Sequence, residues 1–185
     1  MRLFIGIPLP ASVSQEIAAL LTHARSRVPG QQSEQLRWSA PEAWHVTLQF
    51  LGSATAEQYA CLVARLRDVH PGPVPVELSG VGTFERTGVF YAGVQLSPEL
   101  ASLQQAITAA TQPCGFQAED RPYRPHVTLA RRRRNASSRE WRSITSGPHP
   151  PLRRSFTADG FVLYESMPSP EGSRYIPREQ LALES

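Results

Sequence analysis

The tetrapeptide His-Val-Thr-Leu occurs twice in the chain, beginning at His45 and at His126. Successive side chains of a strand point to opposite faces, so each copy presents a histidine and a threonine on one face and two aliphatic side chains on the other. An imidazole has an unperturbed pKa near ~6.5, which lets one ring accept a proton while another donates one near neutral pH. Two such rings, beside the hydroxyls of Thr47 and Thr128, have the chemistry for cleaving a phosphodiester.

A single histidine on a strand is more often a hydrogen-bonded structural residue than a catalyst. The repetition favours a catalytic role over a structural one. Each copy follows a strand and a helix of comparable length, so the two copies occupy equivalent positions in two similar halves of the chain. We therefore predict that His45 and His126 form an acid–base pair across a groove. The remaining histidines lack such a context and are expected to be solvated: His23, His70 and His149.

Arginine supplies all 19 of the basic residues other than histidine, and the sequence contains no lysine. Without lysine there is no lysine–adenylate intermediate, Walker-type phosphate lysine or Schiff base, so ATP-driven ligation and aldolase-like chemistry are excluded. Arginine offers planar, bidentate donors that suit phosphate. The run Arg131 to Arg134 is either an RNA-backbone contact or an ordinary solvated basic face, and both interpretations remain open.

The length of 185 residues suffices for one compact domain that folds without staples. Cys61 and Cys114 are too few for a disulfide scaffold and lack the C-x-x-C spacing of zinc or redox sites, so a reducing cytoplasm is expected. No stretch approaches the roughly 20 apolar residues that cross a bilayer. These features predict a soluble, unprocessed, cytoplasmic protein.

Hydrophobic periodicity and turn residues predict strands interleaved with helices. The expected strands are residues 2–8, 44–51, 76–81, 88–96, 125–130, 156–165 and 174–176. The expected helices follow the first strand as far as Pro29-Gly30 and span residues 56–69 and 98–111. The arginine run and the Ser- and Pro-rich residues 137–151 are expected to form an exposed, mobile excursion. Short connections predict an α+β protein with antiparallel or mixed sheets.

The order of these blocks resembles the two-histidine (2H) phosphoesterase superfamily, and specifically its bacterial RNA 2′,3′-cyclic phosphodiesterases, once named 2′-5′ RNA ligases. The two His-x-Thr motifs are the specific part of the resemblance. Supporting blocks are Arg2–Ile7, His45–Gly52, Arg121–Arg131, Tyr164–Ser166 and Tyr175. The resemblance spans residues 1–185 and implies a single bilobal domain with pseudo-twofold symmetry, whose central cleft receives both motifs.

The resemblance also implies an activity: opening of a terminal 2′,3′-cyclic phosphate of RNA to a 2′-phosphate, without metal or nucleotide cofactor. Some members of the family also join RNA ends reversibly through a 2′-5′ linkage. His45 would activate water and His126 would protonate the departing 3′ oxygen, and ligation would exchange these two labels. Thr47 and Thr128 would hold phosphate oxygens. We expect a monomer whose partner is an RNA or oligonucleotide with a cyclic phosphate end, away from any membrane.

Two further residues match family positions. Arg131 matches an arginine near the phosphate, and Phe50 matches an aromatic residue that packs on the terminal nucleoside. Strand alternation gives His126 the same parity as Arg132, so Arg131 needs a bulge or a loop to reach the cleft. Pro8 stands where many relatives have an acidic residue, which leaves the role of that position open.

Two other classes of function remain open. A non-catalytic RNA-binding module would use the arginine run together with Trp38, Trp44 or Phe50, but it leaves the doubled His-Thr pair unexplained. A metal hydrolase has less support, because no acidic residue lies at ligand spacing from either motif. Within the enzyme interpretation, tRNA fragments with cyclic phosphate ends, 2′-5′-linked oligonucleotides and small cyclic nucleotides all remain candidate substrates.

Overall fold

The computed structural model describes residues 1–26, 36–133, 141, 149, 151–169 and 172–183. Its strands are β1 (Arg2–Pro8), β2 (Leu36–Trp38), β3 (His45–Ser53), β4 (Val74–Phe84), β5 (Val89–Val94), β6 (His126–Arg132), β7 (Arg153–Ala158), β8 (Gly160–Ser169) and β9 (Gly172–Ala182). Its helices are α1 (Ala11–Ser26), α2 (Ala56–Leu66) and α3 (Pro98–Thr111), with short 3₁₀ turns η2 (Pro41–Ala43) and η3 (Gln112–Cys114).

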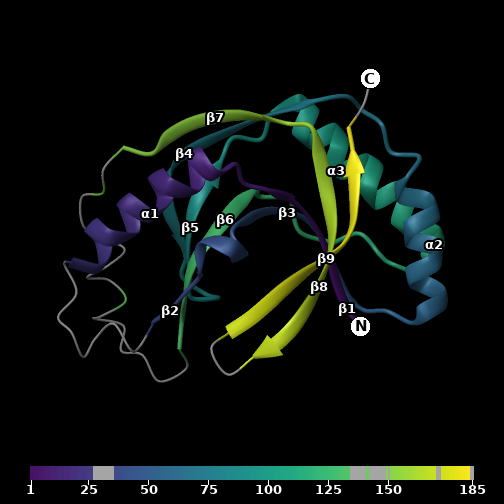
Figure 1. Cartoon of the computed structure of the whole chain (residues 1–185), viewed down its shortest axis with the longest axis horizontal. Coiled ribbons are helices and arrows are strands. Elements are labelled where there is room, and N and C mark those ends of the chain that lie inside the picture. Colours follow the sequence, from purple (N-terminus) through teal and green to yellow (C-terminus); the bar gives the residue numbers. More distant parts are fainter. Residues whose placement is uncertain (27–35, 134–140, 142–148, 150, 170–171, 184–185) are drawn as a thin grey trace.

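The strands of this described part form one sheet in the order β7-β4-β5-β6-β3-β1-β8-β9, with β2 paired to β6 beside this path. Each of its strand pairs is antiparallel. The junction between β6 and β3 divides this path into four strands on each side (Figure 1), and β2 adds a fifth strand on the β6 side. The two lobes meet there at a single residue pair, Val46 with Val127. The predicted two-lobe α+β fold is confirmed.

The two long helices that follow strands β1 and β5 cross between the lobes. Helix α1 follows β1 in the first lobe, yet its Glu16 forms an ion pair with Arg154 of β7 in the second (Figure 1). Helix α3 follows β5 in the second lobe, yet the hydroxyl of Thr111 at its end donates to Oε1 of Gln49 in β3 at 2.9 Å. Each lobe is therefore contacted by a helix that follows a strand of the other lobe.

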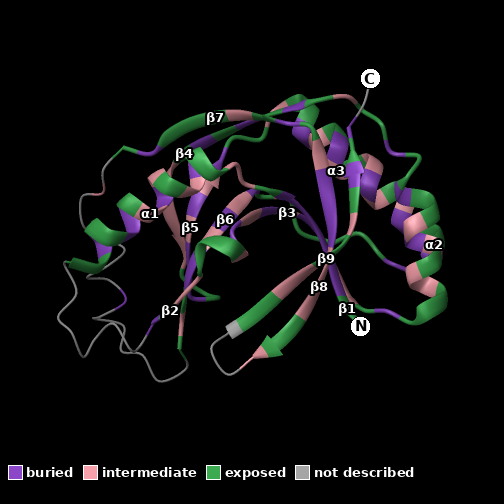
Figure 2. Cartoon of the chain, in the orientation of Figure 1, coloured by how far each residue is buried: buried purple, intermediate pink, exposed green. Residues whose placement is uncertain are grey.

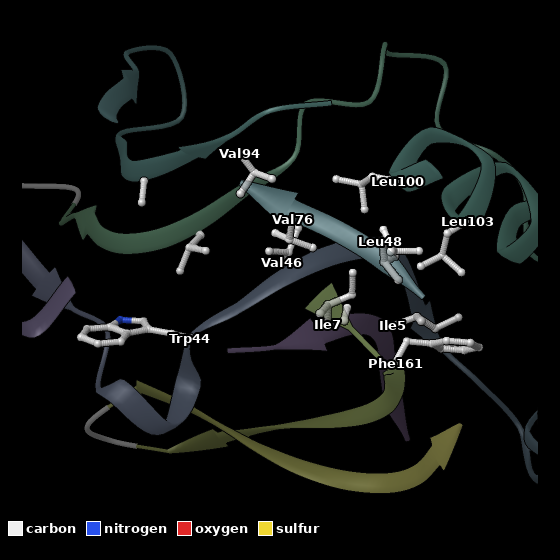
Figure 3. Close-up of a cluster of buried hydrophobic side chains, with 14 of the residues drawn as sticks. Ile5, Ile7, Trp44, Val46, Leu48, Val76, Val94, Leu100, Leu103 and Phe161 are labelled. Carbon is white, nitrogen blue, oxygen red and sulfur yellow. The ribbon is translucent and has the colours of Figure 1, made fainter. Parts of the chain in front are cut away.

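The aliphatic residues of both tetrapeptides lie in the hydrophobic core, as alternation predicts. Val46, Leu48, Val127 and Leu129 are at most 2% exposed. Figure 3 shows the first pair among side chains of β1 and α3, which include Ile5, Ile7, Leu100 and Leu103. Strand β1 is mostly buried, whereas β3 combines buried with partly and fully exposed residues, and α2 and α3 have buried and exposed faces (Figure 2). The core therefore packs against the aliphatic face of the two motif strands, and the histidines and threonines lie on the opposite face.

The predicted single strand over residues 156–165 is wrong. The chain forms β7 and β8 instead, and these strands pair with β4 in one lobe and with β1 in the other. The break falls at Asp159-Gly160, where a Cβ on the glycine would lie 2.8 Å from the carbonyl oxygen of Leu181. The last strand, β9, is also longer than the predicted residues 174–176, because an edge strand tolerates Pro177.

The arginine run and Trp141 also differ from the predicted exposed excursion. Arg131 and Arg132 belong to β6. Trp141 is only 1% exposed, its indole nitrogen donates to Oε2 of Glu85 at 3.0 Å, and the guanidinium of Arg132 lies 5.7 Å from its ring centroid. These contacts anchor Trp141 to the second lobe. Arg134 and most of residues 137–151 lie outside the described residues.

The cysteines and one histidine also depart from expectation. Cys61 of α2 and Cys114 of η3 form a disulfide, with Cα atoms 5.7 Å apart. Two cysteines distant in sequence give no signal of such a pairing. The cysteines therefore do not support the reducing cytoplasm that the sequence led us to expect.

The ring of His149 packs 5.4 Å from that of Phe90 and its nitrogens are buried, so the prediction that His149 is solvated is wrong. The other two histidines outside the motifs are exposed, as predicted. Among the described helices, none is long and apolar enough to cross a bilayer.

Candidate active site

The four polar side chains of the two motifs converge on one face of the sheet. The single β3–β6 pair brings the tetrapeptides together in antiparallel register. Continued by one position to either side, this register aligns His45 with Thr128 and Thr47 with His126. The two histidines are close enough for the charge of His126 to lower the pKa of His45. All four are partly buried, and they face away from the aliphatic core. The repeat therefore places two imidazoles and two hydroxyls around one small area.

The two imidazoles are held in the same way. Nδ1 of His45 lies 2.7 Å from the carbonyl oxygen of Ala43, and Nδ1 of His126 lies 2.7 Å from that of Arg124. Because a carbonyl only accepts, Nδ1 carries the proton in both rings and Nε2 of the neutral ring keeps a free lone pair. The short η2 turn supplies the first carbonyl, and Pro125 restricts its predecessor to the extended conformation that supplies the second. Each Nε2 is thus available for proton transfer.

A β-bulge follows each histidine at the same distance. The register between β1 and β3 skips Leu48, and that between β5 and β6 skips Leu129. An extra residue reverses the alternation of a strand, so the residue five positions after each histidine returns to the histidine face. These residues are Phe50 in β3 and Arg131 in β6. The bulge that Arg131 needs in order to face the cleft is therefore present in β6.

Burial and positive charge lower the pKa of both histidines. Burial is the main cause for His45, and it outweighs the opposing hydrogen bond to Ala43; the charges of His126 and Arg131 lower the pKa further, to about 4. Burial, followed by the charge of Arg131, likewise lowers the pKa of His126 against the hydrogen bond to Arg124. Both rings are therefore predominantly neutral at pH 7 in the free protein, and the positive charge of Arg131 acts on each.

Aromatic rings from both ends of the chain enclose His45. The ring centroids of Phe4, Tyr175 and Tyr164 lie 4.7, 5.2 and 5.8 Å from the imidazole centroid. Phe50 lies 6.2 Å from Phe4 and is 55% exposed, so it is the ring of this cluster with a free face. The cluster shields one side of the imidazole from water and leaves an aromatic surface at the margin of the site.

The second histidine has a smaller aromatic surround. The rings of Phe84 and Tyr91 lie 5.0 and 5.5 Å from the imidazole of His126, and both line a cavity of about 350 Å³. Tyr123 lines the same cavity, and its hydroxyl donates to the carbonyl oxygen of Thr47 at 2.9 Å. Burial raises the pKa of this tyrosine, which therefore keeps its proton for the hydrogen bond. The loop before β6 is thereby fastened to the first motif.

Gly6 is a site residue that motif reasoning missed. A Cβ at this position would lie 3.1 Å from Cδ2 of His45 and 3.0 Å from the carbonyl oxygen of Val46. The absence of a side chain on Gly6 therefore allows the imidazole of His45 to pack closely against β1. The available signal was a glycine inside an otherwise apolar strand, which often marks close approach of a neighbouring group. Phe84 and Tyr91 had no such signal, because aromatic residues are common in any strand.

Nothing in the described part of the chain brings three or more His, Cys, Asp or Glu side chains together as metal ligands. The arrangement instead resembles a proton-transfer pair with anion donors. Two neutral imidazoles with free Nε2 atoms, two hydroxyls and one nearby guanidinium suit an anionic substrate that needs one proton removed and another supplied.

Comparison with known proteins identifies the family of this chain. The model of the 2′-5′ RNA ligase superfamily matches residues 10–167. The chain belongs to this superfamily. Its sequence is 30% identical over 186 residues to the RNA 2′,3′-cyclic phosphodiesterase of Escherichia coli (strain K12), covering 98% of this chain and 96% of that protein. It is 33% identical over 134 residues to the protein of the same name from Geobacillus stearothermophilus, but spans only 41% of that relative's length.

Solved structures of the superfamily share the two-lobe fold. The E. coli LigT structure complexed with 3′-AMP has a TM-score of 0.80 and 26% sequence identity, covering 100% of this chain and 98% of that one. The TT0787 protein of Thermus thermophilus has a TM-score of 0.77 and 27% identity, covering 99% and 98%. The family resemblance identified from the doubled motif is confirmed, and the names of the relatives are those of a hydrolase, the predicted enzyme class.

Proposed function

We propose that this protein hydrolyses the 2′,3′-cyclic phosphate at an RNA end to a 2′-phosphate by acid–base catalysis between His45 and His126, without a metal. The main support is the antiparallel pairing of the two motifs, which places both imidazoles, each with Nε2 free, beside two hydroxyls. The name RNA 2′,3′-cyclic phosphodiesterase, carried by relatives about 30% identical, gives the reaction independent support.

The reaction needs two proton transfers. His45 accepts a proton from water through Nε2 while the water oxygen attacks phosphorus. The bond from phosphorus to the 3′ oxygen breaks, and Nε2 of a protonated His126 donates its proton to that oxygen, leaving a 2′-phosphate. The negative charge of the bound phosphate raises the pKa of His126, and this offsets the lowering seen in the free protein. A 5′-hydroxyl in place of water would form a 2′-5′ linkage, and reversal of that step exchanges the two roles.

The remaining site residues bind the substrate in this proposal. Thr47 and Thr128 donate to the non-bridging phosphate oxygens, where charge accumulates in the transition state. Arg131 adds a charge-assisted donor from the same face. Phe50 offers its exposed ring to the base of the terminal nucleoside. We further propose a cofactor-free, cytoplasmic monomer in which residues 1–185 act as one bilobal domain.

An assay with a synthetic oligonucleotide that ends in a 2′,3′-cyclic phosphate tests this function. The purified protein in excess chelator should convert it to the 2′-phosphate. Sensitivity to phosphatase distinguishes this product from the uncleaved cyclic phosphate, and chromatography against standards distinguishes it from the 3′-phosphate. Binding without turnover would support an RNA-binding module, and loss of turnover on chelation, restored by metal, would support a metal hydrolase. Either result would reject metal-independent catalysis.

The lowered histidine pKa values predict an acidic optimum for kcat/KM, which reports the free enzyme. The base works deprotonated, so kcat/KM should rise as the pH increases through about 4, the pKa of His45. The acid works protonated, so kcat/KM should fall as the pH increases through the pKa of His126, which lies below 6.5. In kcat, which reports the bound complex, the falling limb should lie at higher pH.

Steady-state rates across the pH range check this prediction. Arg131→Gln should move the falling limb of kcat/KM to higher pH, because it removes a positive charge that lowers the pKa of His126. A kcat/KM profile that is constant from acidic to alkaline pH would contradict the two-histidine mechanism.

A further inference from the structure

Arg37 lies beside the candidate site, although no motif includes it. In β2 it stands directly opposite Arg131 of β6 in antiparallel register. Residues opposed in this way project from the same face of a sheet. Since the bulge at Leu129 turns Arg131 to the histidine face, Arg37 projects from that face as well. Both arginines are exposed.

The neighbours of Arg37 support this orientation. Leu36 is 4% exposed and belongs to the hydrophobic core, and Trp38 packs against that core. The side chain between them must therefore point to the opposite face. Across the strand pair, Arg132 lies opposite Leu36 and turns to the ring of Trp141 on the core side. The alternation is thus consistent on both strands.

Within the described part of the chain, no carboxylate forms an ion pair with either of the two opposed arginines. Three ion pairs occur among the described residues, and they join Arg67 to Glu179, Arg154 to Glu16 and Arg178 to Glu165. None of them involves Arg37 or Arg131. Like charges directly opposite each other destabilise a strand pair, so negatively charged phosphates bound at the two guanidiniums, one at each, would relieve this repulsion. The pair therefore has the character of an anion site.

Arg37 is farther from the imidazoles than Arg131 is. Along β6 the cleft face carries His126, then Thr128, then Arg131, and β2 pairs only with the last part of this strand. Consistent with this order, the charge of Arg131 contributes to the lowered pKa of both histidines. An anion held by Arg37 is thus separate from a phosphate held between the two histidines.

We propose that Arg37 binds the phosphate that precedes the terminal nucleotide of the RNA, so that the site selects oligonucleotides over mononucleotides. This inference rests on the proposed function. A nucleoside 2′,3′-cyclic phosphate has one phosphate and cannot use Arg37, whereas any longer strand carries a second one next to the first. A guanidinium binds phosphate through two parallel hydrogen bonds, and the charge it neutralises makes binding depend on salt.

Uridine 2′,3′-cyclic phosphate and the dinucleotide UpU with the same cyclic end are the probes for this inference. Wild-type protein should have the higher kcat/KM on the dinucleotide. Arg37→Gln should lower kcat/KM on the dinucleotide about 10-fold, mainly through KM, and should change the mononucleotide less than about twofold. The slope of log KM for the dinucleotide against log salt should become shallower by about 0.7, the value for one phosphate on a single strand.

Arg65→Gln is the matched control, because it removes the same charge from an exposed position on α2. It should leave both substrates and the salt slope unchanged. An equal loss on both substrates in Arg37→Gln would assign Arg37 to the reacting phosphate, and no loss on either would remove it from the site; both results overturn the inference. Equilibrium binding of the two probes is measured in parallel. If wild-type protein hydrolyses neither, the proposed function fails, and the binding difference still decides the role of Arg37.

Discussion

His45→Ala and His126→Ala should each lower kcat for hydrolysis of an RNA 2′,3′-cyclic phosphate by about 10²–10⁴-fold, the usual contribution of one proton-transfer group. Both rings keep Nε2 free because a backbone carbonyl binds Nδ1, so the substitutions remove the proton-transfer atom itself. KM should change much less, since the proposed phosphate donors Thr47, Thr128 and Arg131 remain. Steady-state kinetics with a cyclic-phosphate oligonucleotide measures both quantities.

The exposed His70 supplies the control for these variants. His70→Ala removes a histidine from a connector outside the cleft and should keep wild-type kinetics. The double variant His45→Ala/His126→Ala should be only slightly slower than the slower single variant, because residues that act as a unit lose their effect together. Circular dichroism and thermal unfolding confirm that each variant is folded. Wild-type rates in either single variant would reject the acid–base pair.

Gly6→Val should lower kcat by about 10²-fold without removing any group that could react. A Cβ here would lie 3.0 Å from the carbonyl oxygen of Val46 and 3.1 Å from the ring of His45, so the larger side chain must displace the imidazole, the adjoining backbone of β3, or both. Displacement of a reacting group by about 1 Å can lower the rate by that factor. Gly6→Ala adds only the Cβ and should have a smaller effect. Kinetics of the two variants should therefore show a graded loss with side-chain size.

An NMR titration distinguishes displacement of His45 from general damage. In Gly6→Val the pKa of His45 should change, because the ring leaves its buried position, while the titration of His126 stays as in wild type. The backbone of residue 6 is not in the left-handed region that favours glycine, so valine introduces no conformational strain of its own. A folded Gly6→Val variant with wild-type kcat would show that the close approach of β1 does not position the imidazole.

Much of the motif geometry was predictable because strand alternation is a local property. The parity of His45 and Thr47 follows from the sequence alone, and so does the burial of Val46 and Leu48. The family resemblance then supplied the cleft and the two-lobe fold. From the sequence we could say that Arg131 needs a bulge to face the histidines, but not that the bulge exists. The extra residue is defined only by the register of β6 with β5.

The features that were missed depend on contacts distant in sequence. Residues 156–165 read as one apolar strand, because periodicity does not reveal that the chain changes lobes at Asp159. The three-residue strand β2 is too short to carry a periodic signal, so the opposition of Arg37 and Arg131 was invisible. The disulfide and the burial of Trp141 likewise arise from tertiary contacts rather than from local pattern.

The pairing of β1 with β8 has a consequence for how this protein acquires its activity. The ring of Phe4, near the start of the chain, stacks on Tyr164 near its end, and both adjoin the imidazole of His45. Contacts between residues so distant in sequence form slowly during folding. A nascent or truncated chain that lacks Tyr164 therefore lacks part of the aromatic enclosure of His45. We expect the proposed hydrolysis to begin only after the last strands have been synthesised and have paired with β1.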